Sequence, residues 1–203
     1  MPDFTFDEET HTYRVDGVVV PSINQVLEAE NFKNTAHYDE WYATRGKFVH
    51  QACHYLVHDI LDWDSLDPQI EGYVRAADQF IKDTRPYIYL SEEPMCVLSP
   101  YKFAGTPDWF ALINKKPAVI DIKCGVIEPW MGLQFAPQEL LWRDGFDRQG
   151  HTYSRLIKGK ILRFTLQLKL NGKYNLVPFT GISDKGVFLS ALACYNWKRN
   201  HKK

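Results

Sequence analysis

The chain has 203 residues, of which 45% are hydrophobic and 24% are charged. These proportions are typical of a soluble globular protein and exclude a disordered, collagen-like or coiled-coil chain. The 24 Lys and Arg residues against 25 Asp and Glu residues give a net charge of -1, so the whole molecule has no positive field that would attract nucleic acid. A nucleic-acid partner would therefore have to bind a local basic patch.

The cysteines and the N-terminus indicate the cellular compartment. The four cysteines form no Cys-x-x-Cys pair, which argues against a zinc ribbon or a Cys-ligated iron–sulfur cluster. The N-terminus is acidic and has no apolar segment of the secretory type, and no apolar run approaches the ~20 residues that cross a bilayer. We therefore expect a reduced, cytoplasmic protein that does not contact a membrane.

The N-terminal part of the chain predicts a hairpin followed by helices. The expected strands are residues 4–6, 12–15 and 18–20. Ser22 and Gln25 form a capping-box pattern that begins a short helix over 23–30. A longer helical pattern spans 36–60, with Gly46 as a candidate break, and another spans 67–85. The expected buried face of the 36–60 segment is Phe48, Ala52, Tyr55, Leu56 and Ile60.

The rest of the chain predicts a small sheet, a helix and a final hairpin with a helix. The expected strands are residues 87–90, 95–98, 109–113, 117–123, 161–170 and 174–179. A helix is expected within 130–142, although Pro137 obscures its start, and a last helix begins at Asp184. We predict one α/β domain over 1–203, with an N-terminal hairpin and helix in 1–30, a core in 36–143, and a C-terminal hairpin and helix in 150–203.

The strand at 117–123 ends in an acid and an amine. Successive side chains of a strand point to opposite faces, so Asp121 and Lys123 share one face with Val119. Taken alone, this Asp-x-Lys pattern also fits a structural ion pair. Ligand sites in α/β sheets nevertheless tend to lie at strand ends of this kind.

Asp108 strengthens the functional interpretation. A turn in the segment 114–117 would pair the strand 109–113 with the strand 118–122 and bring Asp108 close to Asp121. Two neighbouring carboxylates repel each other unless a cation lies between them. Oxygen ligands of this kind suit Mg²⁺ or Mn²⁺, and a neighbouring lysine can stabilise charge on a phosphate.

The spacing of these residues resembles a known nuclease motif. Pro107-Asp108, followed after twelve residues by Asp121-Ile122-Lys123, resembles the PD-(D/E)XK nuclease superfamily, and in particular its RecB-like branch with many phage exonucleases. Two further elements occur in the order expected for that branch. Gly46 and His50 match its upstream Gly-x-x-x-His, and Gln134 matches the Gln of its downstream Gln-x-x-x-Tyr helix.

The resemblance implies a restriction-endonuclease-like core, in which a small mixed sheet is flanked by helices. It also implies that His50, Asp108, Asp121 and the carbonyl of Ile122 hold Mg²⁺ or Mn²⁺, and that Lys123 is catalytic. Branch members often add a glutamate from the preceding strand; Glu93 is our candidate and Glu92 its rival.

The implied activity is hydrolysis of DNA to leave 5′-phosphates, with exonuclease action favoured, in recombination or repair in a bacterium or phage-infected cell. A recombination partner protein fits that setting, although no residue identifies one. Gln134 would position the substrate and the catalytic lysine. Gln138 stands where the family has Tyr, and we expect it to face the DNA. The local basic residues chosen as phosphate contacts are Lys158, Lys160 and Arg163.

Two alternatives remain open. One is a DNA-binding module whose active site is retired. The other is a zinc hydrolase built on the ladder of His50, His54 and His58, because histidines four residues apart on a helix can share a metal.

Overall fold

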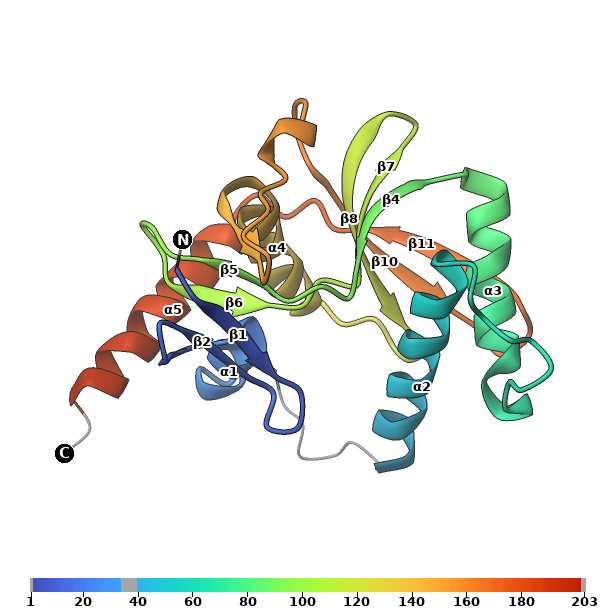
Figure 1. Cartoon of the computed structure of the whole chain (residues 1–203), viewed down its shortest axis with the longest axis horizontal. Helices are drawn as coiled ribbons and strands as arrows, with labels where there is room; N and C mark the ends of the chain where they lie inside the picture. Colours follow the sequence, from blue (N-terminus) through green and yellow to red (C-terminus); the bar gives the residue numbers. More distant parts are fainter. Residues whose placement is uncertain (1, 34–39, 202–203) are drawn as a thin grey trace.

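The computed structural model describes residues 2–33 and 40–201 (Figure 1). Its centre is a five-stranded mixed sheet with the order β11-β10-β8-β7-β4. Strands β8 and β10 pair in parallel, whereas the other neighbours in this sheet are antiparallel. The strands are β4 (Tyr87–Ser91), β7 (Trp109–Ile113), β8 (Lys116–Lys123), β10 (Leu162–Leu168) and β11 (Tyr174–Pro178). The predicted mixed α/β architecture is therefore confirmed.

The β7–β8 hairpin sets the register at the end of this sheet. Asn114 and Lys115 both have positive φ angles, of 49° and 65°, as a two-residue hairpin turn of the primed type requires. With this turn Trp109 lies opposite Ile120. Asp108 therefore lies directly before this pair on β7, and Asp121 lies directly after it on β8. The expected approach of the two acidic positions comes from this hairpin.

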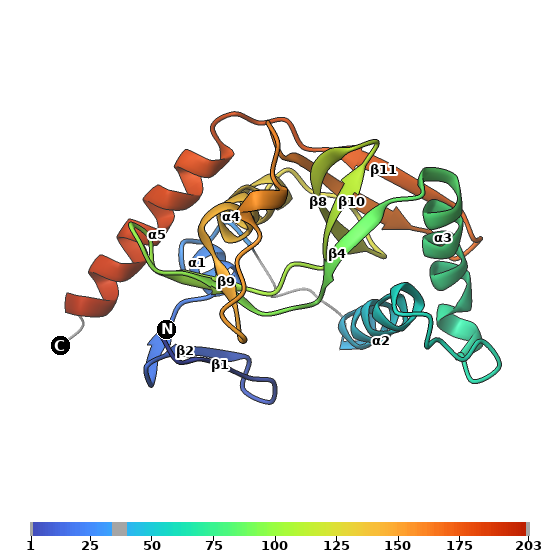
Figure 2. The ribbon, with the colours of Figure 1, turned by 45° about the horizontal axis from the view of Figure 1, so that its top comes forward.

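Helices cover both faces of the sheet (Figure 2). On one face, α2 (Glu40–Val57) and α3 (Pro68–Thr84) pack in a core that includes Ile120 and Ile122. On the other face, Phe110 and Val119 pack with α1, α4 and α5. These helices are α1 (Ile23–Ala29), α4 (Met131–Asp144) and α5 (Asp184–His201). The alternation predicted for β8 is therefore confirmed, and Asp121 and Lys123 lie at the end of the sheet between α2 and α4.

Helix α2 differs from its prediction in two ways. It runs unbroken through Gly46, and the predicted start at 36–39 lies outside the described residues. Its fully buried residues are Val49, Ala52 and Cys53, and Leu56 packs partly against the same core. The predicted face was wrong for Phe48, Tyr55 and Ile60, which are 50%, 37% and 65% exposed. The buried stripe is centred one residue away from the predicted one, which turns Phe48 and Tyr55 outward, and Ile60 lies beyond the end of the helix.

Two smaller sheets complete the N-terminal side of the molecule. The first is β1 (Phe4–Asp7), β2 (Thr12–Val15) and β3 (Val18–Val20). The second is β5 (Met95–Val97), β6 (Phe103–Gly105) and β9 (Phe146–Asp147), of which β6 and β9 were not predicted. A parallel bridge between Ser22 and Ala104 links the chain before α1 to β6. The predicted capping box of Ser22 and Gln25 is present.

The C-terminal prediction is confirmed in its main elements. Helix α4 is continuous around Pro137, and the β10–β11 hairpin leads to α5. A short 3-10 helix, η1 (Ser154–Leu156), precedes β10. None of the described helices combines the length and the apolar character needed to cross a membrane.

Candidate metal centre and substrate cleft

Three side chains converge at the end of the central sheet. His50 Nδ1 lies 3.2 Å from Asp108 Oδ1 and 3.6 Å from Glu92 Oε1. One ligand atom from each of the three residues falls within 4.8 Å of the others. An imidazole and two carboxylates form a donor set that suits a small divalent cation such as Mn²⁺ or Mg²⁺.

Backbone hydrogen bonds fix the two acids. The Oδ2 atom of Asp108 accepts a hydrogen bond of 2.6 Å from the backbone N–H of Ile122, which leaves Oδ1 directed to His50. The carbonyl of Asp108 accepts the N–H of Glu92 at 2.9 Å. Glu92 directly follows β4 and has a left-handed φ of 54°, so the chain turns there. The two acids therefore lie at the ends of neighbouring strands, and a hydrogen bond between their backbones keeps them close together.

Asp121 and Lys123 form an ion pair beside this cluster. Their side chains are 3% and 23% exposed, and Lys123 Nζ contacts Asp121 Oδ2 directly. Burial, together with the negative charge of Asp108, raises the pKa of the Asp121 carboxyl, while the Lys123 ammonium acts in the opposite direction. Burial disfavours the imidazolium of His50, but Asp108 and Glu92 outweigh it and raise the pKa of His50 to about 10.

These groups fit a cation site in their chemistry. His50, Glu92 and Asp108 offer the ligand atoms. Burial, with a smaller contribution from the negative charge of Asp108, raises the pKa of Asp121, and a nearby cation would favour its ionised form. Ile122, whose carbonyl the resemblance implies as a ligand, lies in the same cleft. Asp121 contacts Lys123 and is not one of the three grouped ligand atoms.

The glutamate of the cluster is Glu92, which was the rival candidate. Glu93, the preferred one, is directed to Arg148 instead, with distances of 3.0 Å and 3.3 Å from its two carboxylate oxygens to the guanidinium. The turn at Glu92 separates the two glutamates, because consecutive side chains cannot both face the same point. We therefore replace Glu93 by Glu92 in the candidate ligand set.

The histidine ladder does not gather into one group. His54 Nδ1 lies 3.0 Å from Ser91 Oγ on β4, and the ring of His58 lies 4.5 Å from that of His54. Within the described residues, His50 groups with the two acids and not with the other histidines. The described geometry gives the zinc-ladder alternative no support.

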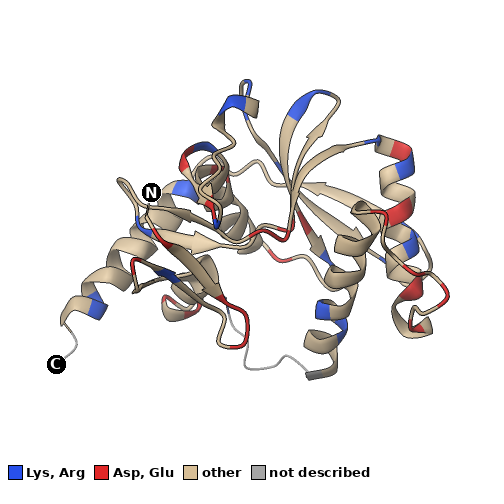
Figure 3. Ribbon diagram, in the orientation of Figure 1, with Lys and Arg blue, Asp and Glu red and all other residues tan. Residues whose placement is uncertain are grey.

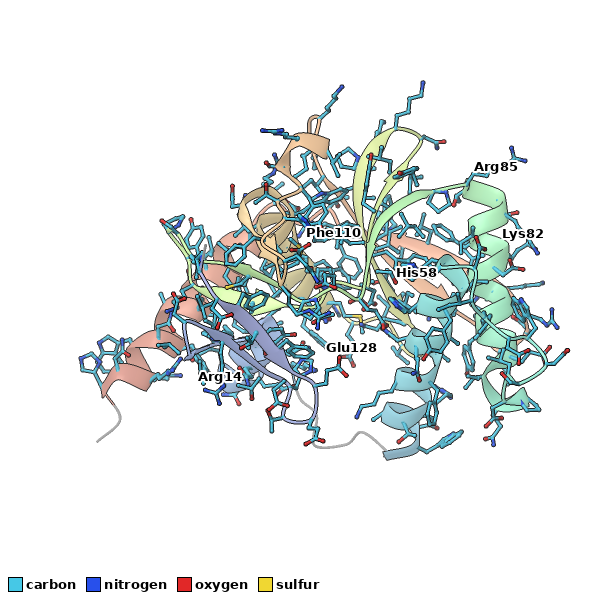
Figure 4. All side chains as sticks on the ribbon, in the orientation of Figure 1. Arg14, His58, Lys82, Arg85, Phe110 and Glu128 are labelled. Atoms are coloured by element: carbon cyan, nitrogen blue, oxygen red, sulfur yellow. The ribbon has the colours of Figure 1, made fainter. Side chains whose placement is uncertain are left out.

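The cluster opens into a large cleft. Its volume is about 1280 Å³, and its lining includes His50, Glu92, Asp108, Asp121, Ile122 and Lys123. Helix α2 forms one wall, and the N-terminal hairpin with the start of α1 forms another. The segment between β8 and α4 also lines the cleft, and its Glu128 is labelled in Figure 4.

Helix α4 presents two glutamines to the cleft. Gln134 and Gln138 are four residues apart and share one helix face. Gln138 is only 3% exposed, and among the described residues neither Oε1 atom has a hydrogen-bond partner. Both positions predicted to face the substrate therefore line the cleft.

The basic residues chosen from the sequence lie elsewhere. Arg163 is 8% exposed and is 3.2 Å from Glu139 Oε1 and 2.9 Å from Asp184 Oδ2. It holds α4, β10 and α5 together, and we assign it this structural role in place of the predicted DNA contact. The exposed Lys158 and Lys160 lie in the loop between η1 and β10, at the top of the view in Figure 3, whereas α2 lies at the bottom.

The sequence interpretation missed the basic residues of the cleft itself. Lys33, Arg45 and Lys47 line it together with Lys123. Arg45 and Lys47 flank Gly46, in the same motif as His50, and their positions on α2 were the available signal.

No protein-family model matches the chain, and no curated protein matches it in sequence.

Proposed function

We propose that the protein is a metal-dependent nuclease of the PD-(D/E)XK type, acting on DNA. The observation that supports this most is the convergence of His50, Glu92 and Asp108 beside the Asp121–Lys123 ion pair, at the end of a mixed sheet and inside one cleft. A restriction-endonuclease-like core, with two helices on one face of the sheet and α4 on the other, is part of the same proposal.

In this proposal His50, Glu92 and Asp108 hold Mg²⁺ or Mn²⁺, and Asp121 borders the site. A divalent ion bound there would act as a Lewis acid toward the phosphate and lower the pKa of a water molecule. Lys123 places its ammonium next to that position, where it neutralises negative charge that develops on the phosphate. Asp121 orients Lys123 through the ion pair.

Gln134 and Gln138 contact the substrate from the α4 side of the cleft. Their unpartnered Oε1 atoms accept hydrogen bonds, and the amide groups can rotate to donate to phosphate or base edges. By the resemblance, the product carries a 5′-phosphate and exonuclease action is favoured. DNA is the proposed substrate, and a recombination protein is the kind of partner that this activity would have.

The test is cleavage of labelled linear single-stranded and double-stranded DNA, beside closed circles, in Mn²⁺ or in EDTA. We expect cleavage in Mn²⁺ only, and loss of at least 100-fold in Lys123→Ala. Lys160→Ala, on the exposed loop, is the matched control and should cleave like the wild type. If closed circles stay intact while linear DNA is cleaved, the activity is that of an exonuclease.

Binding of DNA without any cleavage by the wild type would contradict the nuclease and favour the retired DNA-binding module. Stoichiometric zinc after purification, lost in His54→Ala and His58→Ala, would instead favour the zinc hydrolase.

A further inference from the structure

Arg45 occupies an unusual position on the α2 wall of the cleft. Its guanidinium carbon lies 5.0 Å from the ring centroids of both Tyr42 and Tyr73. One of its terminal nitrogens donates to the carbonyl of Cys124 at 3.3 Å. Two aromatic rings and one carbonyl therefore fix the plane of the guanidinium, and little side-chain entropy remains to be lost when an anion binds.

The positive charge of Arg45 is not neutralised by the described part of the chain. Among the side chains that the structure describes, which are those of residues 2–33 and 41–201, no carboxylate lies within 4.0 Å of it, and its buried Nε has no acceptor. Three arginines differ in this respect: Arg75 contacts Glu71, Arg148 contacts Glu93, and Arg163 contacts two acids. A partly buried guanidinium without a counter-ion is costly unless a ligand supplies the negative charge.

The location of Arg45 indicates which ligand this is. Cys124, whose carbonyl it contacts, directly follows Lys123 on the chain, so the two cationic side chains approach the cleft from adjacent points. Lys47, two residues further along α2, also lines the cleft. A guanidinium with a free edge binds phosphate oxygens in a forked geometry, which makes a phosphodiester the matching anion.

We propose that Arg45 forms a second phosphate subsite, which binds the phosphodiester next to the one held at Lys123. This inference rests on the proposed function, because it takes the nucleic-acid strand as the ligand. Arg45 fixes the register of the strand, and the aromatic rings beside it keep its plane constant. Arg45 is a binding residue in this scheme and has no part in proton transfer.

The experiment measures binding apart from cleavage. The probe is a labelled single strand of about six nucleotides, in Ca²⁺ so that it is not hydrolysed, with fluorescence anisotropy as the readout. We expect Arg45→Ala to weaken binding about tenfold, and Arg45→Lys to weaken it less because the charge is kept and the fork is lost.

A series of strands with one neutral methylphosphonate each locates the contact. At one position the replacement should weaken wild-type binding about tenfold and leave the binding of Arg45→Ala unchanged, because the contact is already absent. The matched control is Arg75→Ala. Arg75 also lies 5.0 Å from an aromatic ring, that of Trp63, but is outside the cleft. Binding by Arg75→Ala should depend on the position of the methylphosphonate in the same way as binding by the wild type.

The outcomes separate the two proposals. If the protein cleaves DNA in Mn²⁺, but each methylphosphonate changes the binding of the wild type and of Arg45→Ala equally, the subsite is overturned and the proposed nuclease activity stands. The expected profiles without any cleavage would keep the subsite and overturn the nuclease. A wild-type protein that does not bind the strand, or an Arg45→Ala variant that is less stable but binds every strand like the wild type, would also overturn the subsite.

Discussion

The carboxylate of Asp108 accepts the backbone N–H of Ile122 at 2.6 Å through one oxygen and faces His50 at 3.2 Å through the other. The first contact fixes the end of the β7–β8 hairpin, and the second belongs to the candidate metal centre. One side chain thus links the local fold to the site, and substitutions that keep one contact while losing the other can separate the two roles.

Asp108→Asn should keep the fold and lose the metal. The amide oxygen can still accept the N–H of Ile122, while the amide nitrogen then faces His50 and cannot serve as a ligand. We expect Mn²⁺ affinity, measured by isothermal titration calorimetry, to fall by at least about tenfold. Asp108→Ala should in addition lower the free energy of unfolding by about 1–3 kcal/mol, because the N–H of Ile122 loses its acceptor. Equal Mn²⁺ affinity in Asp108→Asn and the wild type would contradict this assignment.

The two adjacent glutamates should behave differently. Glu92→Gln removes a carboxylate that lies 3.6 Å from His50 Nδ1, so Mn²⁺ should bind less tightly, by about tenfold. Glu93→Gln breaks only the contact with Arg148 and should bind Mn²⁺ like the wild type. The same calorimetric titration compares the two variants, and a larger loss in Glu93→Gln would restore the original sequence-based choice.

Arg163→Ala should destabilise the protein strongly. The change leaves Glu139 and Asp184 without their buried cation, and the breaking of such a network typically costs about 3–5 kcal/mol. Urea unfolding followed by circular dichroism measures the change. Lys160→Ala, on the neighbouring exposed loop, should change the free energy of unfolding by less than about 0.5 kcal/mol. A stable Arg163→Ala protein with weakened DNA binding would show that the arginine faces the substrate after all.

Gly72→Ala should be among the most damaging small substitutions. A Cβ at this position of α3 would lie 1.7 Å from the carbonyl oxygen of Leu170, just beyond β10, so the helix would have to move away from the sheet. We expect a loss of about 3 kcal/mol or more in the free energy of unfolding. Gly186→Ala in α5 is the control, since nothing lies within 4 Å of its added methyl group. It should be neutral or slightly stabilising, and equal stability of the two variants would argue against the close packing of α3.

Asp147 should make stability sensitive to acid. It is 2% exposed, and burial alone would raise its pKa, but hydrogen bonds from Tyr153 and His151 lower the pKa below its usual value of 3.8. A lowered carboxyl pKa stabilises the folded state above the unfolded-state value, and this contribution disappears as the pH falls through the folded-state value. Wild-type stability should therefore drop below about pH 3.8 by more than that of Asp147→Asn, in urea titrations between pH 7 and pH 2.5. Parallel pH profiles would contradict the role of Asp147.

The sequence predicted those features that local chemistry determines. The turn at 114–115 and the strand alternation sufficed to bring Asp108 near Asp121 and to place Lys123 on the same face as Asp121. The hydrogen bond between Asp108 and Ile122 was not predicted. The histidine came from a motif resemblance, and the structure places it in contact with Asp108.

Features that depend on the tertiary arrangement could not be predicted from the sequence pattern. Nothing in Ser91-Glu92-Glu93 signals the positive φ at Glu92 that selects it over Glu93. The buried face of α2 was misplaced because Phe48 and Tyr55 are apolar enough to suggest a core, although the helix packs through Val49 and Cys53. The burial of Arg163 depends on acids that are distant in the sequence: Glu139 of α4 lies 24 residues before it and Asp184 of α5 lies 21 residues after it.

The two walls of the cleft are anchored in different hydrophobic cores. Helix α2 packs through Val49 and Cys53 into the core that it shares with α3. The opposite wall packs through Tyr13 into the core of the N-terminal sheet and through Ile23 into the core around α1. Substitutions that are far apart and share no partners act additively. In the proposed nuclease, substitutions in the N-terminal wall would therefore change the fit to a DNA strand without moving His50, and substrate preference and metal affinity would evolve separately.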